Sequence, residues 1–261
     1  MNGLTTMQGR VTDRLELLYR TPTQTVADRL PVGLEPVVRG PWSFWTVVCR
    51  RIERLRPVGM PAVCGLSFLS VSYRLRVQAM NDRAEVVAGD YTVRSDVDGR
   101  VISMLGSRLA DRVMHPAAIA SDATDSSMRI TVDQTRCAVG TLDLVAANAP
   151  TYLSADSCFP SLDDARRFAI PIGRSLDVID EPGDRRLRVT RTEGIARAQS
   201  VTPVMLHRDR IGFFDAIDQT RHVRLEWAHR LSPIDAIWRD ETEARLLIQR
   251  ACVDDSVAIA V

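Results

Sequence analysis

The chain has 261 residues, 45% of them hydrophobic, and its 34 basic residues almost balance its 33 acidic ones. This composition suffices for a buried core, and the near-zero net charge argues against binding to nucleic acid or to an anionic membrane surface. Every basic residue is Arg, so Schiff-base chemistry on a lysine side chain is excluded.

The five cysteines are scattered along the chain, and no two of them form a C-x-x-C pair. This pattern predicts reduced thiols and no zinc site built from them. No apolar segment approaches the roughly 20 residues that a membrane-spanning helix needs, and the first residues lack the apolar core of a signal peptide. We therefore expect a cytoplasmic protein with one domain over residues 1–261.

The first half of the chain predicts strands joined by short connections. Apolar and polar residues alternate, as along a half-buried strand, in the ranges 42–52 and 68–77, and the ranges 15–19 and 84–97 also indicate strands. A short helix is expected after the first strand, because Thr21 can cap it, Pro22 suits its first position and Gln24 completes a capping box. This helix should end near Leu30, since the residue before a proline disfavours the helical backbone.

The second half predicts more strands and two helices. A hairpin and four further strands are expected in the ranges 128–136, 139–145, 186–192, 198–206, 211–217 and 223–231. Ser161–Phe168 reads as a helix capped by its serine, and Asp240–Cys252 as a terminal helix. Ser121–Ser127 is expected to be a loop. About ten strands with three short helices predict an α+β, mainly β protein built on curved antiparallel sheets or barrels.

Several segments resemble proteins of the acetoacetate-decarboxylase-like superfamily. The first third carries the resemblance in Leu17–Thr21 and Val26–Glu35, a strand that ends in Tyr-Arg-Thr, one helix and Leu-Pro-Val-Gly-Leu-Glu. Gly65–Arg74, Phe159–Phe168 and Ser232–Arg239 are similar to an uncharacterised branch of that superfamily. The resemblance implies a double-sheet β-barrel that encloses an apolar cavity.

The resemblance also implies that the decarboxylase apparatus is missing. The family enzyme forms a Schiff base through one of two adjacent lysines, and Met114 and His115 stand at those positions here. Trp45 falls where a cavity carboxylate is expected. We therefore expect a protein that binds a small apolar or carboxylate-bearing molecule in its cavity without Schiff-base decarboxylation.

Individual residues allow a functional and a structural interpretation. His115 could act as a general base, or it could be a loop histidine with no role. The arginines could grip a carboxylate or lie in solvent, and the aromatic residues could line a pocket or fill a core. The expected ligand-binding set is Arg20, Trp45, Tyr73, Arg74, Arg108 and Met114.

Other candidates favour the structural interpretation. His207, His222 and His229 lack the close, convergent spacing of metal ligands, so no metal and no cofactor is expected. Cys64 has no recognisable base partner, and Ser67 does not lie in a nucleophile elbow.

Two alternatives to simple ligand binding stay open. One is a lysine-independent hydratase, isomerase or hydrolase that acts on a small keto or carboxylic acid, with His115 assisted by Asp111 or Arg112. The other is an interaction protein, such as a homo-oligomer that assembles through an exposed sheet.

Overall fold

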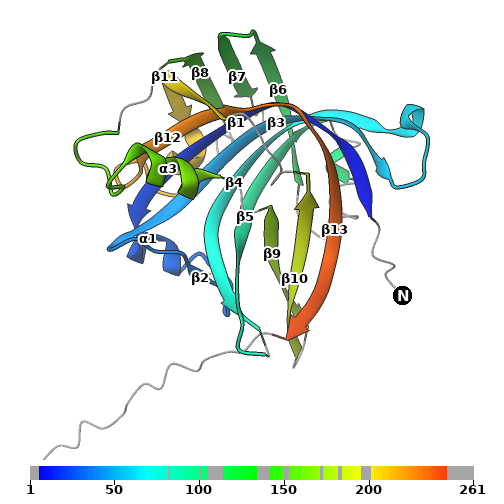
Figure 1. Cartoon of the computed structure of the whole chain (residues 1–261), viewed down its shortest axis with the longest axis horizontal. Coiled ribbons are helices and arrows are strands. Elements are labelled where there is room, and N and C mark those ends of the chain that lie inside the picture. Colours follow the sequence, from blue (N-terminus) through cyan, green and yellow to red (C-terminus); the bar gives the residue numbers. More distant parts are fainter. Residues whose placement is uncertain are drawn as a thin grey trace, which may run out of the picture.

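Thirteen strands make up most of the part of the chain that the computed structural model describes (Figure 1). The described residues are 6–81, 83–99, 102–104, 114–133, 141–149, 153–170, 173–181, 184–194 and 201–245. The strands are β1 (Met7–Pro22), β2 (Glu35–Pro36), β3 (Trp42–Pro57), β4 (Leu66–Met80), β5 (Val86–Asp98), β6 (Met114–Ala123), β7 (Ser127–Asp133), β8 (Leu142–Asn148), β9 (Arg174–Glu181), β10 (Asp184–Glu193), β11 (Val201–Ile211), β12 (Arg224–Leu231) and β13 (Ile234–Arg245). The helices are α1 (Gln24–Ala27), η1 (Ala62–Cys64), α3 (Leu162–Ala169) and α4 (Gly212–Ala216).

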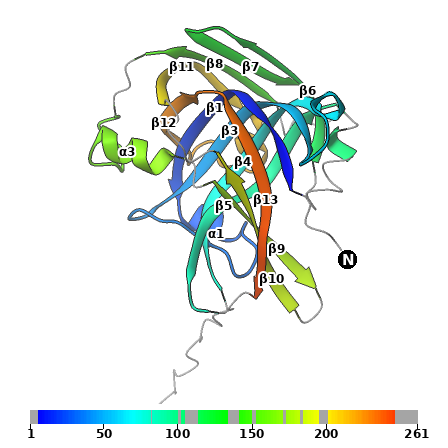
Figure 2. The same ribbon diagram turned by 45° about the vertical axis from the view of Figure 1, so that its right-hand side comes forward.

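The strands close into two rings that share one wall. Strands β1, β3, β4 and β5 pair in that order and form the wall. One ring returns from β5 through β6, β7, β8, β11 and β12 to β1, and the other returns through β9, β10 and β13. Both views place β6, β7, β8 and β11 at one end and β9 and β10 at the other, and β13 runs from the first end to the second (Figure 2). This arrangement confirms the predicted mainly-β, double-sheet architecture.

Strand β1 can serve both rings because it is long and irregular. Met7–Val11 pairs with β13, and Arg14–Arg20 pairs with β12. Between these two parts Asp13 has a φ of 45°, and the register with β3 shifts between Thr12 and Leu15. Such a bulge bends a strand and raises its twist, which lets one strand pass from one ring to the other.

Alternation along the shared wall gives it one apolar and one polar face. The apolar face belongs to the largest core, which also receives residues from the strands β6 to β12 and from α4. Its members from the wall include Leu15, Leu17, Tyr19, Trp45, Val47, Cys49, Val71, Tyr73 and Leu75. The opposite face carries buried polar side chains, which include Arg14, Glu16, Thr46, Ser70, Ser72, Arg76, Asp90 and Ser95. The period of two therefore separates a dry core from a polar interior.

Two small apolar clusters border that polar face. Leu18, Phe44 and Trp227 pack with Phe159 and with helix α3, and this cluster lies toward one end of the wall. Ile52, Phe68 and Val97 form the other cluster, together with Trp238. The polar side chains thus lie between two apolar layers.

Two of the predicted helices form, with one change of cap. The Ser161 side chain accepts a hydrogen bond from Asp164 N, so the predicted cap of α3 is confirmed. Helix α1 follows β1 as expected, but its N-cap is Thr23 rather than Thr21, and it ends at Ala27.

Three predictions of element type are wrong. The range 211–217 was expected as a strand and contains helix α4, because Phe213 and Phe214 are adjacent and both are buried, which an alternating strand does not permit. The expected terminal helix begins inside β13, which extends to Arg245 through its pairing with β10. Most of the expected loop Ser121–Ser127 is also strand, since β6 ends at Ala123 and β7 begins at Ser127. Among the described residues, no helix has the length and apolar character to span a membrane.

Candidate ligand-binding site

The polar interior of the second ring is organised around a buried carboxylate. Arg14 and Glu16 lie two residues apart on β1 and are each 2% exposed. Arg14 donates from Nε to Glu16 Oε1 over 2.8 Å, and its Nη2 donates to the same oxygen. Nε2 of His229, on the neighbouring strand β12, lies 3.6 Å from Glu16 Oε2. The carboxylate therefore stands between a guanidinium and an imidazole.

The charges around this carboxylate determine its protonation. Burial opposes ionisation of Glu16, but the neighbouring Arg14, His229 and Arg74 outweigh it and hold the pKa of Glu16 below its ordinary value. Burial lowers the pKa of His229 to about 4, against the opposing effect of Glu16. At neutral pH the pair is therefore an ionised carboxylate beside a neutral imidazole.

A second buried ion pair lies on the same face. Arg76, 4% exposed, has its Nε 3.5 Å from Asp90 Oδ1, and it also donates from Nη1 to the carbonyl oxygen of Phe168. Arg76 thereby joins the wall to the end of helix α3, and its guanidinium lies 4.8 Å from the centre of the Phe168 ring.

A polar cavity of about 80 Å³ lies between these ion pairs and strands β9, β10 and β13. Its lining residues are Arg14, Arg50, Arg74, Asp90, Gly173, Arg174, Ser175, Thr190, Thr192 and Trp238. Four guanidinium groups and three hydroxyl groups face one acidic side chain in this set. The cavity is thus suited to an anion of a few non-hydrogen atoms, since about 10–15 Å³ of such cavity space holds one water molecule.

Arg14 has one nitrogen left for a ligand. Its Nε and Nη2 are taken by Glu16, whereas Nη1 is buried and has no hydrogen-bond partner among the described residues. A buried donor without a partner costs free energy, and this cost is removed when an acceptor enters the cavity that Arg14 lines.

Comparison with known proteins agrees with this architecture. No protein-family model and no curated protein sequence matches the chain. The enduracididine biosynthesis enzyme MppR, complexed with pyruvate, matches with a TM-score of 0.57 and 11% identity over 95% of this chain and 92% of its own. An acetoacetate-decarboxylase-like enzyme from Sphingomonas wittichii RW1 matches with a TM-score of 0.58 and 11% identity, over 94% of both chains. Acetoacetate decarboxylase from Legionella pneumophila matches with a TM-score of 0.56 and 11% identity, over 92% of this chain and 87% of its own.

The chain has the acetoacetate-decarboxylase-like fold. The resemblance stated from the sequence is confirmed at the level of architecture. Likeness at such identities extends to the fold alone, because one fold can carry many activities. The function must therefore be argued from the side chains of this chain.

Of the residues expected to bind a ligand, Arg74 lines the polar cavity. Arg20 lies elsewhere on β1 and is already engaged, since its Nη1 is 2.6 Å from Glu226 Oε1 and its Nη2 donates to Asp156 over 2.7 Å. Its guanidinium also stacks on Trp42 at 4.9 Å. The pairing fits an arginine that ties the segment before α3 to the wall.

Trp45 and Tyr73 lie together on the apolar face of the wall, in the first ring. Both are fully buried. The Tyr73 ring stacks on Phe213 at 4.3 Å, and Trp45 meets the edges of Phe213 and Phe214. Trp45 also donates from Nε1 to Gln219 over 3.2 Å. Their surroundings are those of core residues, and their role in binding stays a prediction.

Met114 and His115 begin strand β6. Met114 packs against the small cluster that contains Trp238. His115 pairs in register with Asp96, which is fully buried and has an Oδ1 atom 2.8 Å from Nη2 of Arg94. Burial, followed by Arg94, lowers the pKa of His115, and Asp96 opposes this. The carboxylate of Asp96 and the guanidinium of Arg94 thus lie near this histidine.

The remaining sequence candidates are dispersed or lie outside the described residues. Arg108, Asp111 and Arg112 fall outside them. His207 and His222 are exposed and His229 is buried, and no cluster of three metal-ligating side chains occurs within the described ranges.

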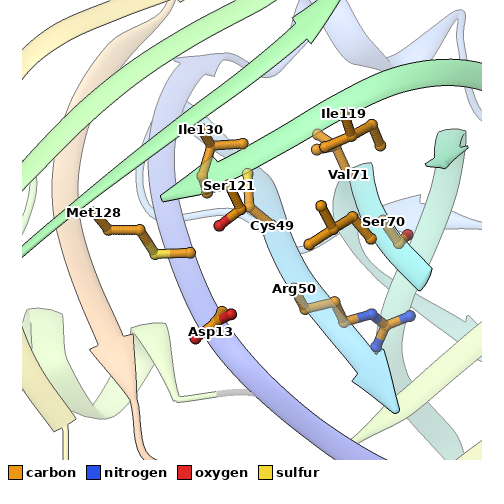
Figure 3. A pocket seen from close by; sticks show the side chains of 10 residues that line it. Asp13, Cys49, Arg50, Ser70, Val71, Ile119, Ser121, Met128 and Ile130 are labelled. Carbon is orange, nitrogen blue, oxygen red and sulfur yellow. The ribbon is translucent and has the colours of Figure 1, made fainter. Parts of the chain in front are cut away.

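A second cavity lies on the apolar side of the wall. It measures about 10 Å³ and lies between β3, β4 and the strands β6 and β7, with Cys49 and Ser121 among its lining residues (Figure 3). This space is about that of one water molecule and too small for a metabolite.

Sequence analysis did not identify Arg14, Glu16 or His229 as site residues. The available signal was the pattern Arg14-Leu-Glu16-Leu, in which two charged residues alternate with residues of a buried strand. An outward, solvated face gives the same pattern, so only closure of the second ring distinguishes the two.

Proposed function

We propose that the chain binds a small carboxylate, such as a 2-oxo acid of the size of pyruvate, in the arginine-lined cavity of the second ring. One observation carries the proposal: Arg14 is held by Glu16 through two nitrogens, while its buried Nη1 has no protein partner among the described residues. Arginine presents its donors in a planar fork that matches a carboxylate.

Two further observations support the proposal. The structural neighbour MppR is complexed with pyruvate, a carboxylate that fits the size of this cavity. Because the chain contains no lysine, the carbonyl group of such a ligand meets no side-chain amine. The bound acid is therefore held without a Schiff base to a side chain.

The test is a titration of the purified chain with pyruvate, followed by ligand-observed NMR and by the fluorescence of Trp238, which lines the cavity. Arg14→Met should weaken binding at least tenfold, as expected from the loss of a hydrogen bond to a charged group worth about 1.5–3 kcal/mol. Arg174→Met alters an exposed lining residue without opening the core and should also weaken binding. Arg129→Met, on the exposed side of β7, is the matched control.

The outcomes separate clearly. Saturable binding that is lost in the cavity variants and kept in Arg129→Met supports the proposal. Absence of pyruvate binding by the wild-type chain, or equal binding by all variants, contradicts it. Sodium borohydride should trap no pyruvate adduct on an internal residue.

A second candidate is a proton-transfer enzyme that acts on a small keto acid through His115. The observation that favours it is the ion pair between the buried Asp96 and the partly buried Arg94 beside this histidine. A carboxylate beside an imidazole can orient it and stabilise its protonated form. Its test is deuterium exchange at the methyl group of pyruvate in D₂O, which should fall to the uncatalysed rate in His115→Gln. Equal exchange rates in both proteins would exclude the role.

A further inference from the structure

Two buried ionisable side chains, Glu16 and His229, form a layer next to Arg14 that does not contact the cavity. Glu16 and His229 are each 2% exposed, and neither lines the cavity. Strands β1 and β12 pair them directly in register. Burying a carboxylate and an imidazole together is costly, so their presence needs a reason.

The geometry gives Glu16 control over the direction of Arg14. An unrestrained arginine has many rotamers and loses this freedom when it binds a ligand. Here the Glu16 Oε1 atom accepts from both Nε and Nη2 of Arg14. These two contacts fix the plane of the guanidinium, and Nη1 is the nitrogen left for the cavity.

His229 borders the other oxygen of the same carboxylate. Its Nε2 lies 3.6 Å from Glu16 Oε2, and neither ring nitrogen has a hydrogen-bond partner among the described residues. The charged groups that act on His229 are Glu16 and Arg14 on β1, Arg76 on β4 and Arg166 on α3. Burial, assisted by the three cations and opposed by Glu16, keeps the imidazole neutral, and a neutral imidazole does not draw Glu16 away from Arg14.

We infer that Glu16 and His229 are positioning residues that aim Arg14 at the carboxylate of the ligand. This inference rests on the proposed function, since it assigns a role within the same site. It predicts that Glu16 affects ligand affinity only through Arg14. It also predicts that the affinity for the ligand falls when Glu16 or His229 takes up a proton. Protonation of either residue weakens the contacts by which Glu16 orients the Arg14 guanidinium.

A double-mutant cycle with pyruvate tests the first prediction. Glu16→Gln should weaken binding about tenfold in the wild-type background and less than about twofold when Arg14→Met is already present, measured by ligand-observed NMR. A purely structural role of Glu16 would lower affinity by the same factor in both backgrounds, and this result would overturn the inference. Glu193→Gln, on β10 and partly exposed, is the matched control and should not change affinity.

The pH dependence of pyruvate binding tests the second prediction. It is measured on the wild-type chain and on His229→Leu, so the buried carboxylate of Glu16 stays in place. Pyruvate affinity should be constant from pH 8 down to about pH 5 and decline as the pH falls through the region around 4 in which His229 takes up its proton, and in His229→Leu the decline should move to lower pH. Profiles that coincide in the two proteins would overturn the role of His229. If wild-type chain binds pyruvate and Arg14→Met weakens it, but Glu16→Gln does not, the inference fails while the proposed function stands. If wild-type chain binds no pyruvate, the proposed function itself has failed.

Discussion

Arg20 forms two ion pairs that differ in burial, and removing this arginine should expose the difference. In the pair of Arg20 and Glu226, the side chains are 6% and 2% exposed. In the pair of Arg20 and Asp156, the acidic side chain is 68% exposed. Arg20→Met leaves the Glu226 carboxylate buried without its cation, which should cost about 3–5 kcal/mol of unfolding free energy. With a urea m-value of about 3 kcal/mol/M, the unfolding midpoint falls by roughly 1–1.7 M.

The assay is equilibrium urea unfolding at pH 7, followed by tryptophan fluorescence. Asp156→Asn removes only the exposed partner and should leave the midpoint close to that of the wild type, because water replaces the lost contact. Arg20→Met combined with Glu226→Gln removes both buried charges and should recover most of the lost stability. A midpoint of Arg20→Met equal to that of Asp156→Asn would refute the reasoning.

Three further predictions concern a helix cap, the thiols and the buried histidine. Ser161→Ala should destabilise the fold by about 1 kcal/mol in urea unfolding, and Ser161→Asp should not, because only the first removes the acceptor for the N-terminal amide. Burial raises the pKa of the Cys49 thiol far above its ordinary value, whereas Cys64 is exposed, so a disulfide-exchange reagent at pH 8 should label Cys64 in the native protein and Cys49 only after unfolding. Burial lowers the pKa of His229 to about 4. His229 therefore binds a proton below about pH 6.5 in the unfolded chain but only near pH 4 in the folded chain. The free energy of unfolding should decrease as the pH falls from 6.5 to 4. His229→Leu should flatten this part of the pH dependence of the urea midpoint, and an unchanged slope would contradict the assignment.

The strands of the wall could be predicted because their periodicity reflects burial directly. In β3 and β4, apolar residues at every second position face the core, and this pattern is local. Strand β13 could not be predicted in the same way. Its second half begins the expected helix Asp240–Cys252 and carries Ala244 as its one apolar residue, and its state is decided by pairing with β10, a strand that lies about 50 residues earlier in the chain.

The site was harder to predict because a closed ring buries polar residues without changing the sequence pattern. Glu16 alternates with buried leucines as any solvent-facing residue would. Arg20 and Arg74 look equivalent in the sequence, yet Arg20 forms an ion pair with Glu226, whereas Arg74 lines the cavity. The difference arises from β12, which carries Glu226, and from β9, which lines the cavity; both elements lie far from the two arginines in the chain.

Strand β1 contributes to both rings, and this has a consequence for synthesis on the ribosome. One edge of β1 can pair with β3 soon after translation, but its other edge waits for β12 and β13, which begin about 200 residues later. Until then a long, largely apolar strand edge stays open to other chains. Yield during expression should therefore depend strongly on temperature and on chaperones, even though in the finished fold that edge pairs with β12 and β13.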